Sequence, residues 1–176
     1  MTRIVAGVAG GRRLRVPAGG TRPTSERVRE ALFSALDAGH ELAGARVLDL
    51  YAGSGALGLE ALSRGASDAY FIEADRRAAE VLRGNVSSLA LGGTVRQGKV
   101  EVVVAEGAAT RFDVVLADPP YALSNIELSG VLRSLAEGGW IAPGGLIVVE
   151  RALRDGDIGW PERYRPLRIR RYGDTA

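Results

Sequence analysis

Four consecutive residues, Asp118-Pro119-Pro120-Tyr121, combine a carboxylate, two rigid residues and an aromatic ring. They follow an apolar run, residues 112–117, that predicts a buried parallel strand. Open α/β sheets bind ligands beyond the carboxyl ends of such strands. Asp118 can accept one hydrogen of an amino group and the Pro119 carbonyl the other, while both prolines fix the backbone, and Tyr121 can stack on a flat ring. These four residues are therefore the candidate catalytic site for chemistry on a flat ring that bears an amino group, such as a nucleic-acid base if the motif described below binds a nucleotide cofactor.

The amino nitrogen of a base is a poor nucleophile, because its lone pair is delocalised into the ring. Two fixed acceptors favour a pyramidal nitrogen whose lone pair points at the incoming group, so the expected help is electrostatic preorganisation and positioning. A stacked base cannot reach such a site, so the target must be single-stranded or flipped out. The alternative interpretation of the motif is an ordinary strand-to-loop turn.

A second motif lies upstream, where Gly53, Gly55 and Gly58 match G-x-G-x-x-G after the predicted strand 47–50. The pattern is typical of a nucleotide-cofactor loop, with a tight turn into a helix as the alternative. Glu73 lies twenty residues after Gly53, at the end of the next predicted strand, where a carboxylate can accept both hydroxyls of a ribose.

Nicotinamide dinucleotides and S-adenosylmethionine are both compatible with this loop and ribose acid, and Asp49 distinguishes them. Asp49 precedes the first glycine by four residues. A carboxylate there would repel a pyrophosphate at the helix N-terminus, but suits the sulfonium and α-amino cations of S-adenosylmethionine. The loop lacks G-K-[ST], which disfavours a P-loop.

The net charge of +2 is unevenly distributed along the 176 residues. Residues 1–30 carry seven arginines against two glutamates, a net charge of +5, and residues 151–176 carry seven arginines against four acids, a net charge of +3. Residues 31–150 carry nine bases against fifteen acids, a net charge of −6. A basic arm on an acidic body indicates a polyanion partner, with a solvated basic tail as the alternative.

Composition excludes several classes of protein. The length indicates one domain, and the absence of cysteine excludes disulfides and thiolate metal sites. A single histidine, His40, allows neither a histidine triad nor a histidine metal cluster, and we expect no metal. The amino terminus is too short in apolar length for a signal peptide, and no stretch approaches a transmembrane helix, so we expect a cytoplasmic protein.

Alternating strands and helices predict a mostly parallel, doubly wound α/β sheet preceded by a β-hairpin and helix extension. The hairpin turns at Gly10-Gly11, and the first helix opens at Pro23-Thr24 with an apolar face that includes Val28, Ala31 and Leu36. Residues 100–107 fit either a strand or a helix. The remaining predicted strands are residues 47–50, 69–72, 94–96, 112–117, 146–149 and 164–171, and the remaining helices are 55–64, 75–91 and 126–138.

The motifs Val47 to Gly55, Phe71 to Asp75 and Ala117 to Tyr121 resemble class I, Rossmann-like S-adenosylmethionine methyltransferases of the N6-adenine/N2-guanine type. The arginine-rich head, residues 3–29, is similar to that of the RsmD family. The resemblance implies transfer of a methyl group to guanine N2 in 16S ribosomal RNA, at guanine 966 in the family, within a small-subunit assembly particle. It divides the chain into an RNA-binding extension, residues 1–40, and a methyltransferase domain, residues 41–176.

The resemblance also implies site residues. Asp118, Pro119, Pro120 and Tyr121 would grip the guanine. The expected cofactor-binding residues are Asp49, Tyr51, Ala52, Gly53, Ser54, Gly55, Glu73, Ala74, Lys99 and Val100. The expected RNA-binding residues are Arg12, Arg13, Arg22, Thr24, Arg27 and Arg29. Lys99 is a departure, because many relatives place an acid there, near the adenine; adenine recognition is then expected to fall to backbone groups.

Three other functions remain open from the sequence. An N6-adenine DNA methyltransferase would share the chemistry, although the chain has no room for a target-recognition domain. A non-catalytic RNA-binding module could retain the fold, although intact Asp118 and Tyr121 argue against it. An NAD-dependent oxidoreductase conflicts with Asp49.

Overall fold

The computed structural model describes residues 1–19 and 25–176. Five parallel strands form the central sheet in the order β5-β4-β3-β6-β7, and a separate antiparallel pair, β1-β2, precedes them. The strands are β1 (Thr2–Arg3), β2 (Arg13–Leu14), β3 (Arg46–Leu50), β4 (Asp68–Glu73), β5 (Thr94–Gln97), β6 (Phe112–Ala117) and β7 (Ile141–Val149). The helices are α1 (Glu26–Ala38), α2 (Ala56–Ser63), α3 (Arg76–Leu89), α4 (Val100–Ala105), α5 (Asn125–Glu137) and the short 3₁₀ helix η1 (Leu153–Asp155). The predicted doubly wound α/β fold is confirmed.

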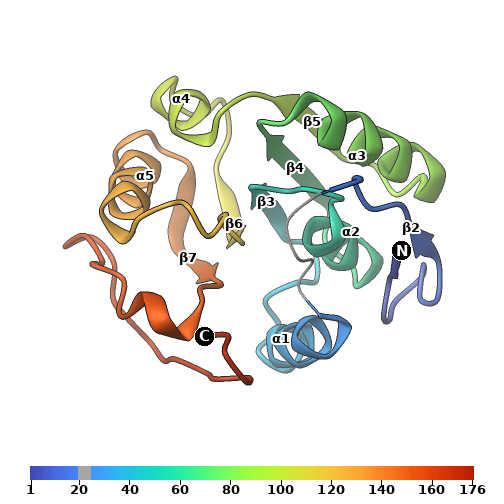
Figure 1. The fold of residues 1–176 in the computed structure, drawn as a ribbon, viewed down its shortest axis with the longest axis horizontal. Helices are drawn as coiled ribbons and strands as arrows, with labels where there is room; N and C mark the ends of the chain where they lie inside the picture. Colours follow the sequence, from blue (N-terminus) through green and yellow to red (C-terminus); the bar gives the residue numbers. More distant parts are fainter. Residues whose placement is uncertain (20–24) are drawn as a thin grey trace.

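Helices cover both faces of the sheet, with α2 and α3 on one side and α4 and α5 on the other (Figure 1). Alternate strand residues face opposite sides, as a period of two requires. On β6, Val114 and Leu116 belong to the cluster under α2 and α3, whereas Val115 and Ala117 belong to the cluster under α4 and α5. A strand buried on both faces is necessarily apolar throughout, which explains the uninterrupted apolar run in the sequence.

The N-terminal extension packs into the first of these clusters. Ile4, Leu14 and Phe33 are buried in one hydrophobic cluster with residues of β3, α2 and β4. Gly7 has a positive φ of 85°, and a Cβ there would lie 2.0 Å from the carbonyl oxygen of Ser63, so only glycine allows this approach of the hairpin to α2. The hairpin and the body therefore share one core.

A buried charge on α2 holds the hairpin in place. The carboxylate of Glu60 is fully buried, and its two oxygens accept hydrogen bonds from the backbone N–H groups of Val5 and Ala6 at 2.9 and 3.1 Å. The same carboxylate pairs with Arg29 of α1 at 3.3 Å and with Arg64 at 2.9 Å. One side chain thus connects the hairpin, α1 and α2.

Some of the predicted elements differ from the structure. Residues 100–107, which fitted either element, contain helix α4, because Val100, Val103 and Val104 bury one helical face. The predicted strand over residues 164–171 is wrong: that segment contains no regular element, since Pro166 has no N–H to donate and residues 165–171 are exposed.

The first helix also departs from its prediction. Helix α1 begins at Glu26 after an N-cap at Ser25, whose side chain accepts from the Val28 N–H. The predicted start at Pro23-Thr24 lies outside the described residues. The fully buried residues of α1 are Arg29, Phe33 and Leu36; of the expected face, Leu36 is buried, whereas Val28 and Ala31 are only partly buried. Within the described ranges, no helix has the length and apolar character needed to cross a membrane.

Candidate active site

The site lies where the strand order of the sheet reverses. The first strand of the sheet in the chain, β3, lies between β4 and β6, and the chain proceeds outward on either side of it. Leu50 of β3 is in register with both Ile72 of β4 and Ala117 of β6. The next residues, Tyr51, Glu73 and Asp118, therefore leave three adjacent strands at the same edge. Such a reversal point is where open α/β sheets bind ligands.

The Asp118-to-Tyr121 loop is fastened at its base and exposed at its tip. Pro119 is buried, whereas Tyr121 is 55% exposed. The loop turns back through a hydrogen bond of 3.0 Å from the Leu123 N–H to the Pro120 carbonyl. A stackable ring is thus presented to solvent by a rigid base.

Two arginines that sequence reasoning did not single out hold this loop. The buried Arg151 follows β7 by two residues, and its Nη2 donates to the carbonyl of Leu123 at 2.7 Å. The guanidinium carbon of Arg154 lies 5.6 Å from the centre of the Tyr121 ring, a cation–π contact. The excess of arginine after residue 150 is the signal that could have drawn attention to them.

The glycine loop connects β3 to α2 through three residues with positive φ: Tyr51 at 56°, Gly53 at 57° and Gly55 at 85°. At Gly55 a Cβ would lie 2.3 Å from the Leu82 side chain, so a side chain is excluded there by packing. At Gly53 no heavy atom would lie within 4 Å of a Cβ, so this backbone is open to a ligand. The predicted loop is therefore present, and the two glycines act differently.

Tyr51 points its hydroxyl into the protein rather than toward solvent. The hydroxyl is buried and has no hydrogen-bond partner within the described residues, and burial raises the pKa of Tyr51 above its ordinary value. The ring packs with the α4 and α5 cluster. The Tyr51 side chain therefore anchors the glycine loop to the core, and its role in cofactor binding stays a prediction.

Glu73 is positioned by the loop that it is expected to serve. Its Oε1 accepts from the Gly53 N–H at 2.8 Å and its Oε2 from the Asp75 N–H at 2.7 Å. Each carboxylate oxygen has a second lone pair for a further donor. A half-buried carboxylate beside open glycine backbone has acceptors left for further donors, and its role toward a ribose stays a prediction.

Asp49 lies beneath the glycine loop, with 1% of its surface exposed. Its Oδ2 accepts from the Gly58 N–H at 2.9 Å, in the first turn of α2. Burial is the main cause that raises the pKa of Asp49 well above its ordinary value of 3.8; the bond from Gly58 lowers the pKa, and the charges of Asp118 and Glu73 raise it. Because the carboxylate occupies the helix N-terminus, a pyrophosphate there would meet a competing acid.

We expect Asp49→Asn to raise the free energy of unfolding near neutral pH. The pKa of Asp49 is higher in the native state than in the unfolded state, so protonation stabilises the native state. This stabilisation is complete at pH values below the pKa of the unfolded state and is lost as the pH rises through the native pKa. Asparagine keeps an acceptor for the Gly58 N–H and does not ionise. Urea unfolding at a series of pH values should show the variant's advantage growing from about pH 4 upward; parallel curves for variant and wild type would contradict the shifted pKa.

The segment expected near an adenine lies between β5 and α4. Lys99 is exposed and occupies the N-cap position of α4, without a side-chain capping bond. Val100 is 2% exposed and packs in the core, so its side chain faces away from the surface. The Gly98 N–H donates to the Glu73 carbonyl, and the Gln97 amide donates to the Ala74 carbonyl. One backbone bond and one side-chain bond thus join this segment to Glu73 and Ala74.

The expected RNA-binding arginines fall into two groups. Arg12, Arg13 and Arg27 are exposed, as phosphate contacts require. Arg29 is 0% exposed and pairs with Glu60, so the expectation that it contacts phosphate is wrong: its guanidinium neutralises a buried acid. The remaining two predicted residues, Arg22 and Thr24, lie outside the described residues.

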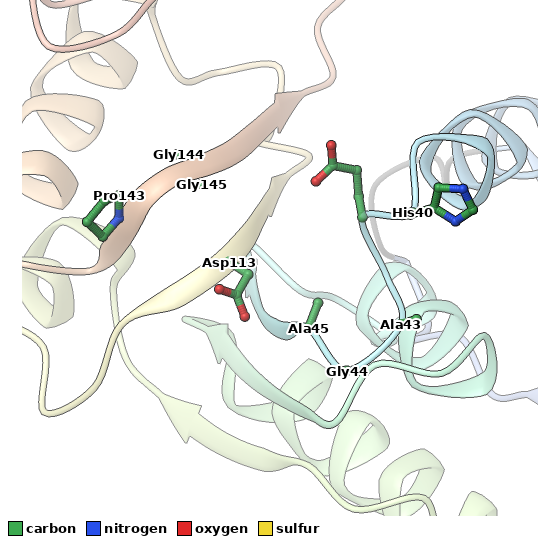
Figure 2. A pocket seen from close by; sticks show the side chains of 9 residues that line it. His40, Ala43, Gly44, Ala45, Asp113, Pro143, Gly144 and Gly145 are labelled. Atoms are coloured by element: carbon green, nitrogen blue, oxygen red, sulfur yellow. The ribbon is translucent and has the colours of Figure 1, made fainter.

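A cavity of about 350 Å³ lies at the opposite edge of the sheet (Figure 2). It is bounded by His40 and Ala45 before β3, Asp113 near the start of β6, and Gly144 in β7. The Asp113 carboxylate accepts from the Arg46 N–H at 2.9 Å. This cavity is at the amino ends of the strands, away from Asp118 and the glycine loop.

Comparison with known proteins agrees with this architecture. A family model described as Conserved hypothetical protein 95 matches residues 2–176. The Ribosomal RNA small subunit methyltransferase D of Escherichia coli K12 is 40% identical over 157 residues, which cover 88% of this chain and 76% of that protein. The protein of the same name from Haemophilus influenzae is 35% identical over 176 residues, covering 97% and 89%.

Solved structures give the same result. The structure of yhhF from Escherichia coli has a TM-score of 0.87 at 35% identity and covers 98% of this chain and 93% of its own. A protein from Thermus thermophilus has a TM-score of 0.82 at 38% identity, covering 99% and 96%. Because these matches span nearly every residue, the chain belongs to the RsmD family of methyltransferases, which share the class I fold.

Proposed function

We propose that this protein transfers a methyl group from S-adenosylmethionine to the N2 amino group of guanine 966 in 16S ribosomal RNA, during maturation of the small ribosomal subunit in the cytoplasm. One observation carries the proposal: the amino-group grip, Asp118 to Tyr121, and the glycine loop, Gly53 to Gly55, leave adjacent strands at the same edge of the sheet. The names of the relatives support ribosomal RNA as the substrate.

The cofactor, when bound, supplies an electrophilic methyl group on a sulfonium sulfur. Glu73 would hold its ribose, and the open backbone at Gly53 would approach its methionine moiety. The Asp118 carboxylate and the Pro119 carbonyl would each accept one hydrogen of the guanine N2 group, which turns the nitrogen lone pair toward the methyl group. Tyr121 would stack on the base, worth about 1–3 kcal/mol. The rigid base of this loop, held through Leu123, keeps the two acceptors in place.

The exposed arginines of the extension support an RNA partner. Arg12 and Arg13 lie on the hairpin and Arg27 on α1, and the extension is joined to the body through the buried Glu60. Phosphate contacts fix register and orientation while the base site supplies selectivity. The hairpin would therefore position a flipped guanine over the Asp118 loop.

Adenine N6 in DNA is the alternative acceptor, because the Asp118 grip suits either amino group. A single assay separates the two. Small ribosomal subunits from cells that lack the gene, 16S RNA alone and duplex DNA are each incubated with the protein and methyl-labelled S-adenosylmethionine, and the product nucleoside is identified by mass spectrometry. N2-methylguanosine in ribosomal RNA supports the proposal; N6-methyladenine in DNA, with unlabelled RNA, overturns it.

A further inference from the structure

Asn85 on α3 connects the extension with the glycine loop. Its side chain is buried, with 4% of its surface exposed. Its Oδ1 accepts from the Arg15 N–H at 2.9 Å, and its Nδ2 donates to the Arg15 carbonyl at 2.9 Å and to the Ser54 carbonyl at 2.8 Å. One amide group therefore binds two backbone segments that are 39 residues apart in the chain.

The two segments belong to the two proposed binding surfaces. Arg15 directly follows β2, two residues after the exposed Arg13. A second bond joins the hairpin to the same helix, from Arg12 Nη2 to the Ser88 carbonyl at 3.0 Å. At the other end of the amide, Ser54 lies between the two glycines of the cofactor loop. The hairpin and the loop are thus fixed to the same two turns of α3.

The Ser54 carbonyl lies between two glycines whose N–H groups are held, that of Gly53 by Glu73 and that of Gly55 by the Ala52 carbonyl, and the Asn85 amide holds the carbonyl itself. Gly53 and Gly55 both adopt positive φ and have the widest backbone freedom of any residue type. The Asn85 amide fixes the direction of the carbonyl between them, and the position of that amide depends in turn on its two bonds to Arg15. Any ordering of the Arg15 backbone is therefore passed to the loop through one side chain.

We propose that Asn85 is a positioning residue that couples RNA binding on the hairpin to cofactor binding in the glycine loop. The inference rests on the proposed function. RNA bound to the arginines of the hairpin further restrains the Arg15 backbone and, through Asn85, the Ser54 peptide, and so reduces the entropy that the loop loses when the cofactor binds, which gives positive cooperativity. Because such coupling is reciprocal, the cofactor raises RNA affinity by the same factor.

The test measures the dissociation constant of S-adenosylhomocysteine by calorimetry, with and without a 16S RNA fragment that contains the target guanine. Wild-type protein is expected to bind at least about five-fold more tightly with RNA present. Asn85→Asp keeps the acceptor for Arg15 and loses both donors; we expect its ratio to fall to about one. Ser87→Ala, at an exposed position on the same helix, is the matched control and should keep the wild-type ratio.

The outcomes separate this inference from the proposed function. A wild-type ratio of one, with both ligands bound, overturns the coupling and leaves the function intact; this measurement needs no variant to fold. An Asn85→Asp protein with the wild-type melting temperature and the wild-type ratio also overturns it, since Asn85 then carries no coupling. Absence of wild-type binding to both the RNA fragment and the small ribosomal subunit overturns both proposals together.

Discussion

Replacing Asp118 by alanine is expected to reduce methyl transfer by about 10³-fold, the effect of removing one preorganised group that stabilises a transition state. The carboxylate is proposed to hold one hydrogen of the acceptor amino group, and alanine leaves that hydrogen without a partner. Asp118 follows β6 at the edge where Glu73 and the glycine loop also lie, but it is not part of the glycine loop. Cofactor affinity should therefore change little.

Asp113→Ala is the matched control for this experiment. Asp113 lies on the same strand, at the other edge of the sheet, beside the cavity of Figure 2. Its loss removes an exposed hydrogen bond to Arg46, which costs about 1 kcal/mol of stability and leaves the site untouched. Single-turnover transfer and calorimetric titration with S-adenosylhomocysteine should be compared for the two variants. Turnover by Asp118→Ala that matches wild type would remove the proposed grip on the amino group.

Glu60→Ala should lower the free energy of unfolding by about 3–5 kcal/mol, the cost of breaking a buried ion pair from one side. Arg29 would remain buried without its acid. Burial lowers the pKa of Arg29 and Glu60 opposes that shift, so the charged guanidinium loses its compensation when Glu60 is removed. The N–H groups of Val5 and Ala6 would lose their acceptors as well. Since a whole domain is stable by only about 5–15 kcal/mol, this is among the largest single-site effects expected here.

Urea unfolding measures this loss, and Glu30→Ala provides the comparison, because Glu30 is an exposed glutamate on α1. That control is expected to change stability by less than about 0.5 kcal/mol. Similar midpoints for the two variants would show that the buried carboxylate does not join hairpin, α1 and α2. A double change, Glu60→Gln with Arg29→Met, should recover part of the loss, because no buried charge is then left unpaired.

The elements and the site edge could be predicted because local patterns determine them. Apolar runs predicted the strands, and the rule that parallel sheets bind ligands at their carboxyl edges placed Asp118 and Glu73 correctly on one side. The helix predicted over residues 75–91 is α3, which begins after Asp75, and the Asp75 side chain accepts from the Arg77 N–H. Each of these inferences needs only residues that are close together in the chain.

The failures involve partners that are distant in the chain. Arg29 was expected to be an exposed phosphate contact because its neighbours are basic, but its buried partner, Glu60, is 31 residues away. The buried face of α1 was predicted only in part for the same reason, since it includes the expected Leu36 but also Arg29 and Phe33. Arg151 and Asn85 were missed because their importance depends on main-chain carbonyls, which every residue has.

The shared core of the hairpin and the body limits how substrate choice can evolve. Ile4 and Leu14 fill the same cluster as the strands, and Gly7 touches Ser63 too closely for any other residue. An N-terminal extension from a distant relative would therefore need the α2 helix against which it packs. New RNA targets are therefore more accessible through changes of the outward arginines, one at a time, than through exchange of the head as a module.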